Sequence, residues 1–198
     1  MLNDLQKVER LAKLAVHEGE DRIVTASELA EELANQPKAP SVATGFPELD
    51  KLIGNVEYGE LVLISGPTGG GKSSLMRSIT KHLSKSQHCL WFNFEDTNKQ
   101  FLSRFDFNPP LFYMPRQNLD NTVVWMNDRI DEANEKGHKI GVVFIDHLHA
   151  ILSQMRFQGN LSMEIGDIVQ KIKDFATQKN LVVFLGAHCL DLADKSII

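Results

Sequence analysis

The sequence predicts a three-layer α/β domain built on a parallel sheet, and three observations favour this fold class. Four short apolar runs have the length expected for buried strands, at 61–64, 89–94, 142–145 and 181–185. Segments with helical periodicity separate some of these runs, at 122–136 and 162–178. A glycine-rich stretch directly follows the first run. Because apolar strands that alternate with helices are typical of parallel sheets covered on both faces, we expect three layers.

The composition is that of one folded domain with a short appendage. The chain has 198 residues, of which 42% are hydrophobic and 24% are charged, so a disordered or collagen-like chain is excluded. The formal net charge of −5 means that any contact with nucleic acid must be local. Cys89 and Cys189 lack metal-ligand spacing, and the charged N-terminus is not apolar enough for a signal peptide or a membrane span. We therefore expect a cytoplasmic protein without a membrane partner.

The N-terminal third of the sequence predicts short helices before the core. Residues 2–18 carry apolar side chains at spacings of three and four, which indicates an amphipathic helix. Thr25 and Glu28 have the spacing of a capping box that begins a second helix. Two prolines then end this helix, where a helix-turn-helix motif would need its recognition helix, so an interface or linker helix is the better interpretation. We expect a helical segment at 1–36, a linker at 37–43 and the core at 44–198.

The glycine-rich stretch has the spacing of a phosphate-binding loop, G-x-x-x-x-G-K-[ST], between a predicted strand and a predicted helix. The candidate nucleotide-binding residues are Gly66, Pro67, Thr68, Gly69, Gly70, Gly71, Lys72, Ser73 and Ser74. Backbone N–H groups of such a loop point at phosphate oxygens. Lys72 would neutralise the β- and γ-phosphates of ATP or another nucleoside triphosphate, and the Ser73 hydroxyl would ligate Mg²⁺. The alternative is an ordinary strand–helix turn that happens to contain a lysine.

Two carboxylates follow other strands and complete the predicted chemistry. Asp146 comes directly after the run at 142–145, where it would hold Mg²⁺, although it could instead cap a helix at 147–152. Glu95 closes the second run and is the candidate catalytic base that activates water. Its neighbour Asp96 competes for that role, and either residue could simply begin a solvated helix at 97–105.

Histidines also stand at the ends of the predicted strands. His188 ends the fourth strand, where it would contact the γ-phosphate as a catalytic sensor, or would have a purely structural role. His147 and His149 flank Leu148, and one interpretation pairs them with Asp146 around a metal, but zinc sites usually need a third protein ligand. We therefore expect no metal at that pair besides the Mg²⁺ of the nucleotide.

These motifs resemble the RecA-like ATPases with a P-loop, and among them the hexameric replicative helicases of the DnaB type. The resemblance rests on Thr44-Gly45-Phe46-Pro47-Glu48-Leu49-Asp50, on the run from Gly59 through the P-loop, and on Phe94-Glu95. It implies that Glu95 is the catalytic base. The pairs Asp146-His147 and Ala187-His188 are similar to the phage primase-helicase and Twinkle branch, which implies that His188 senses the γ-phosphate.

The same resemblance implies partners for the chain. It implies hydrolysis of ATP with Mg²⁺, action on single-stranded DNA, and a homo-oligomer that is a hexameric ring in the full-length protein. The polar segment 153–160 would then be a DNA-contacting loop, or else an ordinary surface loop. No candidate arginine finger follows His188, so the core is expected to be truncated or specialised. The remaining candidates for a group that completes a neighbour's site are Arg104, Arg116 and Arg129.

A second interpretation remains open. A nucleotide-dependent regulatory ATPase of the RecA family, similar to RadA or KaiC, would bind protein partners without helicase activity. The net charge of −5 and the absence of further motifs after the fourth strand favour this alternative. The pairs Asp146-His147 and Ala187-His188 favour the helicase.

Overall fold

The structure is a computed structural model that describes residues 4–17, 19, 21–105, 108–152 and 161–188. The chain divides into two compact units, residues 1–38 and 39–198. In chain order the elements are α1 (Asp4–Ala15), α2 (Ala26–Ala34), β1 (Ser41–Val42), α3 (Pro47–Ile53), β2 (Val56–Glu57), β3 (Leu61–Gly66), α4 (Lys72–Leu83), β4 (Cys89–Asn93), α5 (Asn98–Ser103), α6 (Val123–Glu135), β5 (Val142–Asp146), α7 (Leu148–Leu152), α8 (Leu161–Gln178) and β6 (Val182–His188).

The N-terminal unit consists of the helices α1 and α2. The predicted capping box is confirmed, because the Thr25 hydroxyl accepts the Glu28 N–H at 3.2 Å while the Glu28 carboxylate accepts the Thr25 N–H at 2.8 Å. The apolar stripe of α1 is exposed, with Val8 at 66% and Leu11 at 64% of full exposure. The α2 helix likewise buries no residue.

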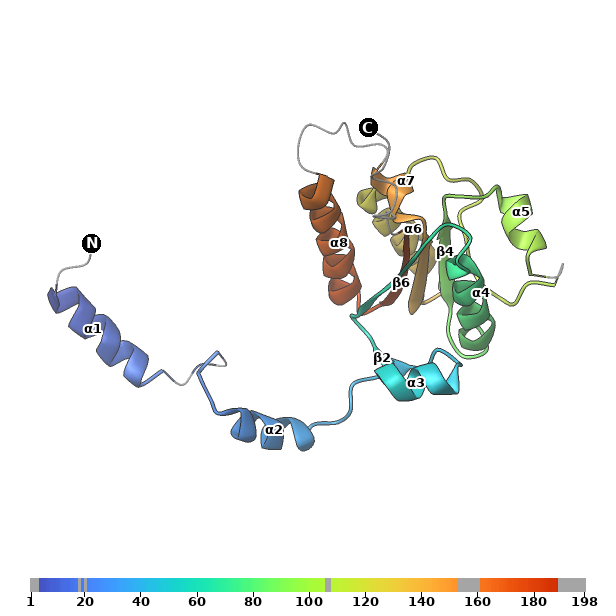
Figure 1. Cartoon of the computed structure of the whole chain (residues 1–198). Coiled ribbons are helices and arrows are strands. Elements are labelled where there is room, and N and C mark those ends of the chain that lie inside the picture. The colour runs from blue at the N-terminus through green and yellow to red at the C-terminus, as the bar shows by residue number, and fades with distance from the viewer. Residues whose placement is uncertain (1–3, 18, 20, 106–107, 153–160, 189–198) are drawn as a thin grey trace, which may run out of the picture. The chain divides into compact units, whose positions relative to one another are not determined.

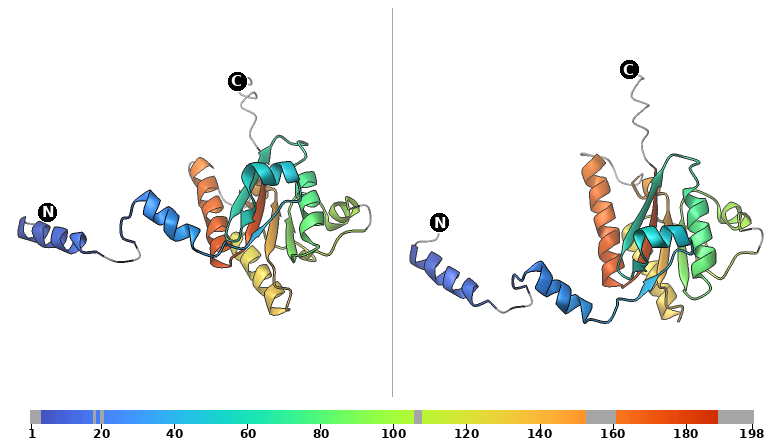
Figure 2. Two further views of the ribbon diagram at one scale, coloured as in Figure 1. Left: turned by 90° about the horizontal axis from the view of Figure 1, so that it is seen from below. Right: turned by 60° about the horizontal axis from the view of Figure 1, so that its bottom comes forward.

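The predicted three-layer α/β fold is confirmed in the second unit. Its four-stranded sheet has the order β3-β6-β5-β4, and each pair of neighbours is parallel. The four apolar runs form these four strands, and every residue of β4 and β5 is buried. The α8 helix lies on one side of the sheet and α4 on the other (Figures 1 and 2).

Alternate residues of each strand enter the two halves of the core. On β5, Val143 and Ile145 pack in the cluster formed with α6, α7 and α8. Val142 and Phe144 point the other way, into the cluster that contains Met76 of α4 and Phe101 of α5. Helices on both faces therefore explain why the strands are continuous apolar runs rather than alternating ones.

The structure corrects one boundary and adds elements that the sequence analysis did not predict. Ser41 and Val42 were expected in the linker at 37–43, but they form β1 and pair antiparallel with β2. The α3 helix lies between these two strands in sequence. Its Asp50 carboxylate accepts the Thr44 N–H and hydroxyl, both at 2.7 Å, and the Gly45 N–H at 3.2 Å. These bonds hold the turn before α3 in place, which explains structurally why Thr44 and Asp50 occur in the Thr44–Asp50 motif.

Among the described residues, none of the helices has both the length and the apolar character needed to cross a membrane. The segment 153–160, named above as a possible DNA-contacting loop, lies outside the described residues.

Candidate functional site

The register of the sheet brings the predicted site residues to one edge. Gly66, the first residue of the P-loop, pairs with His188 at the end of β6. Asn93, the last residue of β4, pairs with Asp146 at the end of β5, and Glu95 lies two residues beyond. Because all four strands are parallel, their carboxyl ends meet where α/β sheets commonly bind ligands.

The P-loop holds the Lys72 ammonium at its centre. Lys72 is the first residue of α4, and the loop enters this helix through Gly71, whose φ of 84° lies in the left-handed region that favours glycine. The ammonium donates to the carbonyl oxygens of Gly66 and Pro67, both at 2.9 Å. With only 9% of Lys72 exposed, these bonds fix a positive charge beside the N-terminus of a 12-residue helix, an arrangement suited to an anion.

A small pocket of about 160 Å³ opens at this helix terminus. It is lined by Gly69 to Ser74 together with Arg77, Glu95, Arg104 and His188. Three of these side chains, from Lys72, Arg77 and Arg104, are cationic. The pocket therefore combines backbone N–H groups with positive charge, as a polyphosphate requires.

Arg77 was not singled out by the sequence analysis. Its Nη2 donates to the Ser74 hydroxyl at 2.9 Å, whereas its buried Nη1 has no hydrogen-bond partner among the described residues. Burial, followed by the neighbouring Arg104 charge, lowers the pKa of this guanidinium. A ligand oxygen in the pocket would supply the missing partner. The sequence signal was a single arginine in the second turn of the helix after the P-loop.

Ser73 and Asp146 form the candidate magnesium site. Only 3% of Asp146 is exposed, and burial raises the pKa of its carboxyl while a hydrogen bond with the Ser73 side chain opposes the rise. Gly186 makes room for this carboxylate, because a Cβ there would lie 3.0 Å from Asp146 Oδ1. Two adjacent oxygen ligands, one of them a buried carboxylate, fit the preference of Mg²⁺.

Glu95 and Asp96 have different surroundings. The Asn93 side chain closes the turn after β4: its Nδ2 donates to the Asp96 carbonyl at 2.9 Å, and its Oδ1 accepts the Asp96 N–H at 3.3 Å. Asp96 forms an ion pair with Arg104 at 2.8 Å. Glu95 is exposed and lines the P-loop pocket. The geometry thus places Glu95 at the pocket and pairs its competitor with a cation.

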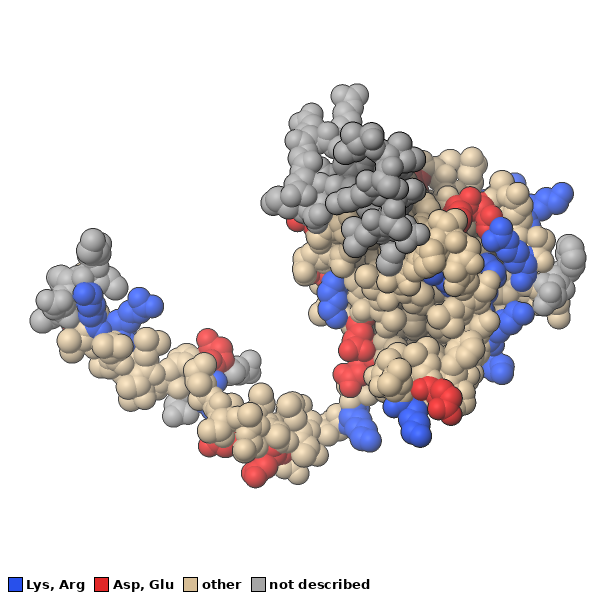
Figure 3. Space-filling model, viewed as in Figure 1, with Lys and Arg blue, Asp and Glu red and all other residues tan. Residues whose placement is uncertain are grey.

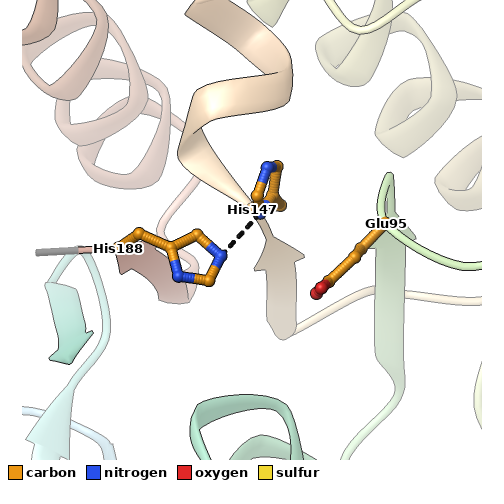
Figure 4. A group of neighbouring side chains, drawn as sticks. All are labelled: Glu95, His147 and His188. Carbon is orange, nitrogen blue, oxygen red and sulfur yellow. Dashed lines mark hydrogen bonds between the residues drawn. The ribbon is translucent and has the colours of Figure 1, made fainter. Parts of the chain in front are cut away.

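His188 connects the P-loop to the end of β5. Its Nδ1 lies 3.1 Å from Lys72 Nζ and 3.3 Å from the Thr68 hydroxyl, and its Nε2 lies 3.0 Å from His147 Nδ1 (Figure 4). Burial is the main cause of a lowered pKa for His188, and the charge of Lys72 adds to it. A neutral imidazole is therefore expected at neutral pH, a few ångströms from where a phosphate would meet Lys72.

The remaining candidates are three arginines and His149. Arg104 lines the pocket of its own chain and pairs with Asp96. Arg129 pairs with Glu132 on α6, and the Arg116 carbonyl accepts a bond from the Asn98 side chain at 2.9 Å. Nothing is described of the His149 side chain, so the geometry does not address the pair His147 and His149.

Comparisons with known proteins give a family match and similar sequences. The family model described as "ATPase family associated with various cellular activities (AAA)" matches residues 62–198, more than half of the chain. The chain is also similar to the DNA repair protein RadA of Aquifex aeolicus, at 25% identity over 72% of this chain and 31% of that protein. RadA of Bacillus subtilis is 25% identical over 83% of this chain and 34% of that protein. The chain thus spans about a third of the length of these relatives.

Proposed function

Since the chain belongs to the ATPase family associated with various cellular activities, we propose that residues 44–198 form the ATP-hydrolysing core of a motor that acts on single-stranded DNA. The observation that carries the proposal is the convergence of Lys72, Asp146 and Glu95 at one edge of the sheet. No single element could supply these groups. A parallel sheet with this register places them together.

Each group has a role in phosphoryl transfer. Lys72 and the N–H groups of the P-loop bind the β- and γ-phosphates of ATP. Ser73 and Asp146 would hold Mg²⁺, which when bound neutralises phosphate charge and orients the triphosphate. Glu95 accepts the proton of the attacking water. His188 contacts the γ-phosphate and registers its loss.

The finer assignment is a replicative helicase of the DnaB type, in the phage primase-helicase and Twinkle branch. Two features support it: the resemblance of the pairs Asp146-His147 and Ala187-His188 to that branch, and the position of His188 within 3.1 Å of Lys72. Figure 3 shows Lys and Arg side chains along the edge of the core that carries α4 and α5, on the right of that view. Despite the net charge of −5, such an edge gives phosphate groups a local contact surface.

The second candidate is a RadA-like ATPase without helicase activity. The similarity to two proteins named DNA repair protein RadA favours it, as does the acidic net charge. Both candidates share ATP hydrolysis at the same pocket. They differ in whether the chain binds and moves along a single strand.

A salt titration of single-strand binding tests the DNA assignment. With a non-hydrolysable ATP analogue and Mg²⁺ present, a fluorescent thymidine oligonucleotide should bind, and log K should fall linearly with log salt because phosphate contacts release counterions. The same titration without nucleotide is the control, and weaker binding is expected there. Binding that is undetectable at low salt in both states would reject the DNA-directed motor and favour the regulatory ATPase.

We also propose that the N-terminal helices mediate self-association into an oligomer, a hexameric ring in the full-length protein. The exposed apolar stripe of α1 supports this, since the free energy falls when a second copy covers large apolar side chains. Deletion of residues 1–36 should shift the sedimentation coefficient toward that of a monomer. Leu11→Glu should also shift the sedimentation coefficient toward that of a monomer.

A matched variant controls for added charge. Gln6→Glu adds the same charge on the opposite face of α1 and should leave the sedimentation profile unchanged. Unchanged sedimentation after both the deletion and Leu11→Glu would show that α1 is not an interface.

A further inference from the structure

Nucleotide chemistry gives roles to Glu95 and His188 but none to His147, which lies beside them at the strand ends. Glu95, His147 and His188 follow or end β4, β5 and β6, and each offers one ligand atom within 4.8 Å of the other two (Figure 4). Two nitrogens and one carboxylate oxygen converge there. We propose that Glu95, His147 and His188 bind a transition-metal dication of the zinc class.

The spacing of the two imidazoles fits a shared metal. Two histidine nitrogens on one tetrahedral Zn²⁺, each at about 2.0–2.1 Å from the ion, lie about 3.4 Å apart. His147 Nδ1 and His188 Nε2 are 3.0 Å apart, so a separation of a few tenths of an ångström makes room for the ion. This movement replaces the hydrogen bond between the rings with two metal–nitrogen bonds.

The backbone fixes two of the three ligands. His188 is the last residue of β6 and is held by the pairing of that strand with β3. His147 has a φ of 82°, a left-handed conformation that is uncommon outside glycine and is found enriched at functional sites. The exposed Glu95 side chain is the adjustable third ligand. Two positioned imidazoles and one movable carboxylate give a partly preorganised site.

A metal bound through His188 Nε2 changes the tautomer of this imidazole. Without metal, the Lys72 ammonium can only donate to Nδ1, 3.1 Å away, so Nε2 carries the ring proton and donates to His147 Nδ1. The metal takes the place of that proton, Nδ1 becomes protonated, and the Thr68 hydroxyl at 3.3 Å accepts from it while Lys72 keeps its bonds to the Gly66 and Pro67 carbonyls. The Glu95 carboxylate offsets one of the two positive charges that the metal adds beside this ammonium.

The donor set separates this site from the magnesium site. Ser73 and Asp146 offer oxygen ligands, which Mg²⁺ prefers, whereas two imidazoles and a carboxylate favour Zn²⁺, Co²⁺, Ni²⁺ or Cu²⁺. Three protein ligands leave a fourth position open. Since Glu95 and His188 line the P-loop pocket, a bound metal would also block hydrolysis; this consequence rests on the proposed function, whereas metal binding itself does not.

The test is a titration of the full chain with Co²⁺ without nucleotide, in excess Mg²⁺ that fills oxygen-only sites. The visible absorption bands of four-coordinate Co²⁺ should appear and saturate, and Zn²⁺ should displace them. His147→Ala and Glu95→Gln should each weaken Co²⁺ affinity at least about tenfold. His17→Ala, which removes a histidine from the N-terminal unit, should leave the affinity unchanged.

Thermal unfolding shows whether each variant is folded. If His147→Ala is not folded, His147→Asn replaces it in the Co²⁺ titration. Equal Co²⁺ affinity in the wild type and in both folded cluster variants would overturn the proposal, as would a titration without visible bands. If the bands appear but the chain does not hydrolyse ATP, the metal site stands and the proposed function fails.

Discussion

Lys72→Ala should weaken binding of Mg²⁺-ATP by about 10- to 100-fold, since a hydrogen bond to a charged group contributes about 1.5–3 kcal/mol. The ammonium is nearly buried and held by two loop carbonyls, so no other cation can take its place without moving the loop. Arg77 and Arg104 line the same pocket and should retain part of the affinity. Isothermal titration calorimetry with a non-hydrolysable ATP analogue measures this loss.

Two further variants make this result specific. Lys85→Ala removes an exposed lysine just after α4 and should bind the analogue as the wild type does. Lys72→Gln keeps an amide donor for the loop carbonyls but loses the charge, so it should also bind weakly while unfolding at a temperature close to that of the wild type. Equal affinity of the wild type and Lys72→Ala would mean that the loop does not bind the phosphates.

Glu95→Gln should retain nucleotide binding and lose turnover. The amide keeps the size and hydrogen-bonding capacity of the side chain but cannot accept a proton from water, and loss of a general base costs about 10²–10⁴-fold in rate. Glu95 is exposed at the pocket rather than paired in the core, so the substitution should leave stability nearly unchanged. Steady-state phosphate release and calorimetry on the same preparation separate the two effects.

Asp96→Asn is the matched control for this prediction. Asp96 forms an ion pair with Arg104, so its amide variant should disturb a local contact and reduce turnover far less than Glu95→Gln. If Asp96→Asn abolished hydrolysis while Glu95→Gln did not, the base would have been assigned one residue too early.

Much of this site could be predicted because parallel sheets follow a simple rule. Each strand is an apolar run, and the residue that ends the run lies at the same edge of the sheet as the ends of its neighbours. Glu95, Asp146 and His188, which follow or end three of these runs, could therefore be placed together without knowing the strand order. The capping box at Thr25 could be predicted equally well, because it depends on residues only three positions apart in the sequence.

The features that could not be predicted depend on contacts across the sheet. The bond between His147 and His188 joins the residue that follows β5 to the last residue of β6, and it exists only because these two strands are neighbours. Gly186 is favoured because Asp146 and Met76 lie beside it in the folded chain. The short strand at Ser41–Val42 was assigned to a linker, since two residues with no apolar alternation carry no strand signal.

The family assignment also separates into a general and a specific part. The match to the AAA family and the four-stranded parallel sheet support a nucleotide-binding ATPase core. The DnaB-type helicase rests on pairs such as Asp146-His147, which neither the family match nor the RadA relatives test, so it stays a prediction.

Single-turnover hydrolysis by the full chain tests most directly whether the ends of the four strands form one catalytic site. Radiolabelled ATP with Mg²⁺ is mixed with excess protein, so that nearly all of the nucleotide is bound, and the conversion to ADP is followed over time. We expect the wild type and Asp96→Asn to convert the bound ATP, while Glu95→Gln keeps it intact and Lys72→Ala leaves most of it unbound. Bound ATP that the wild type does not convert, or that Glu95→Gln converts at the wild-type rate, would contradict this assignment of the site.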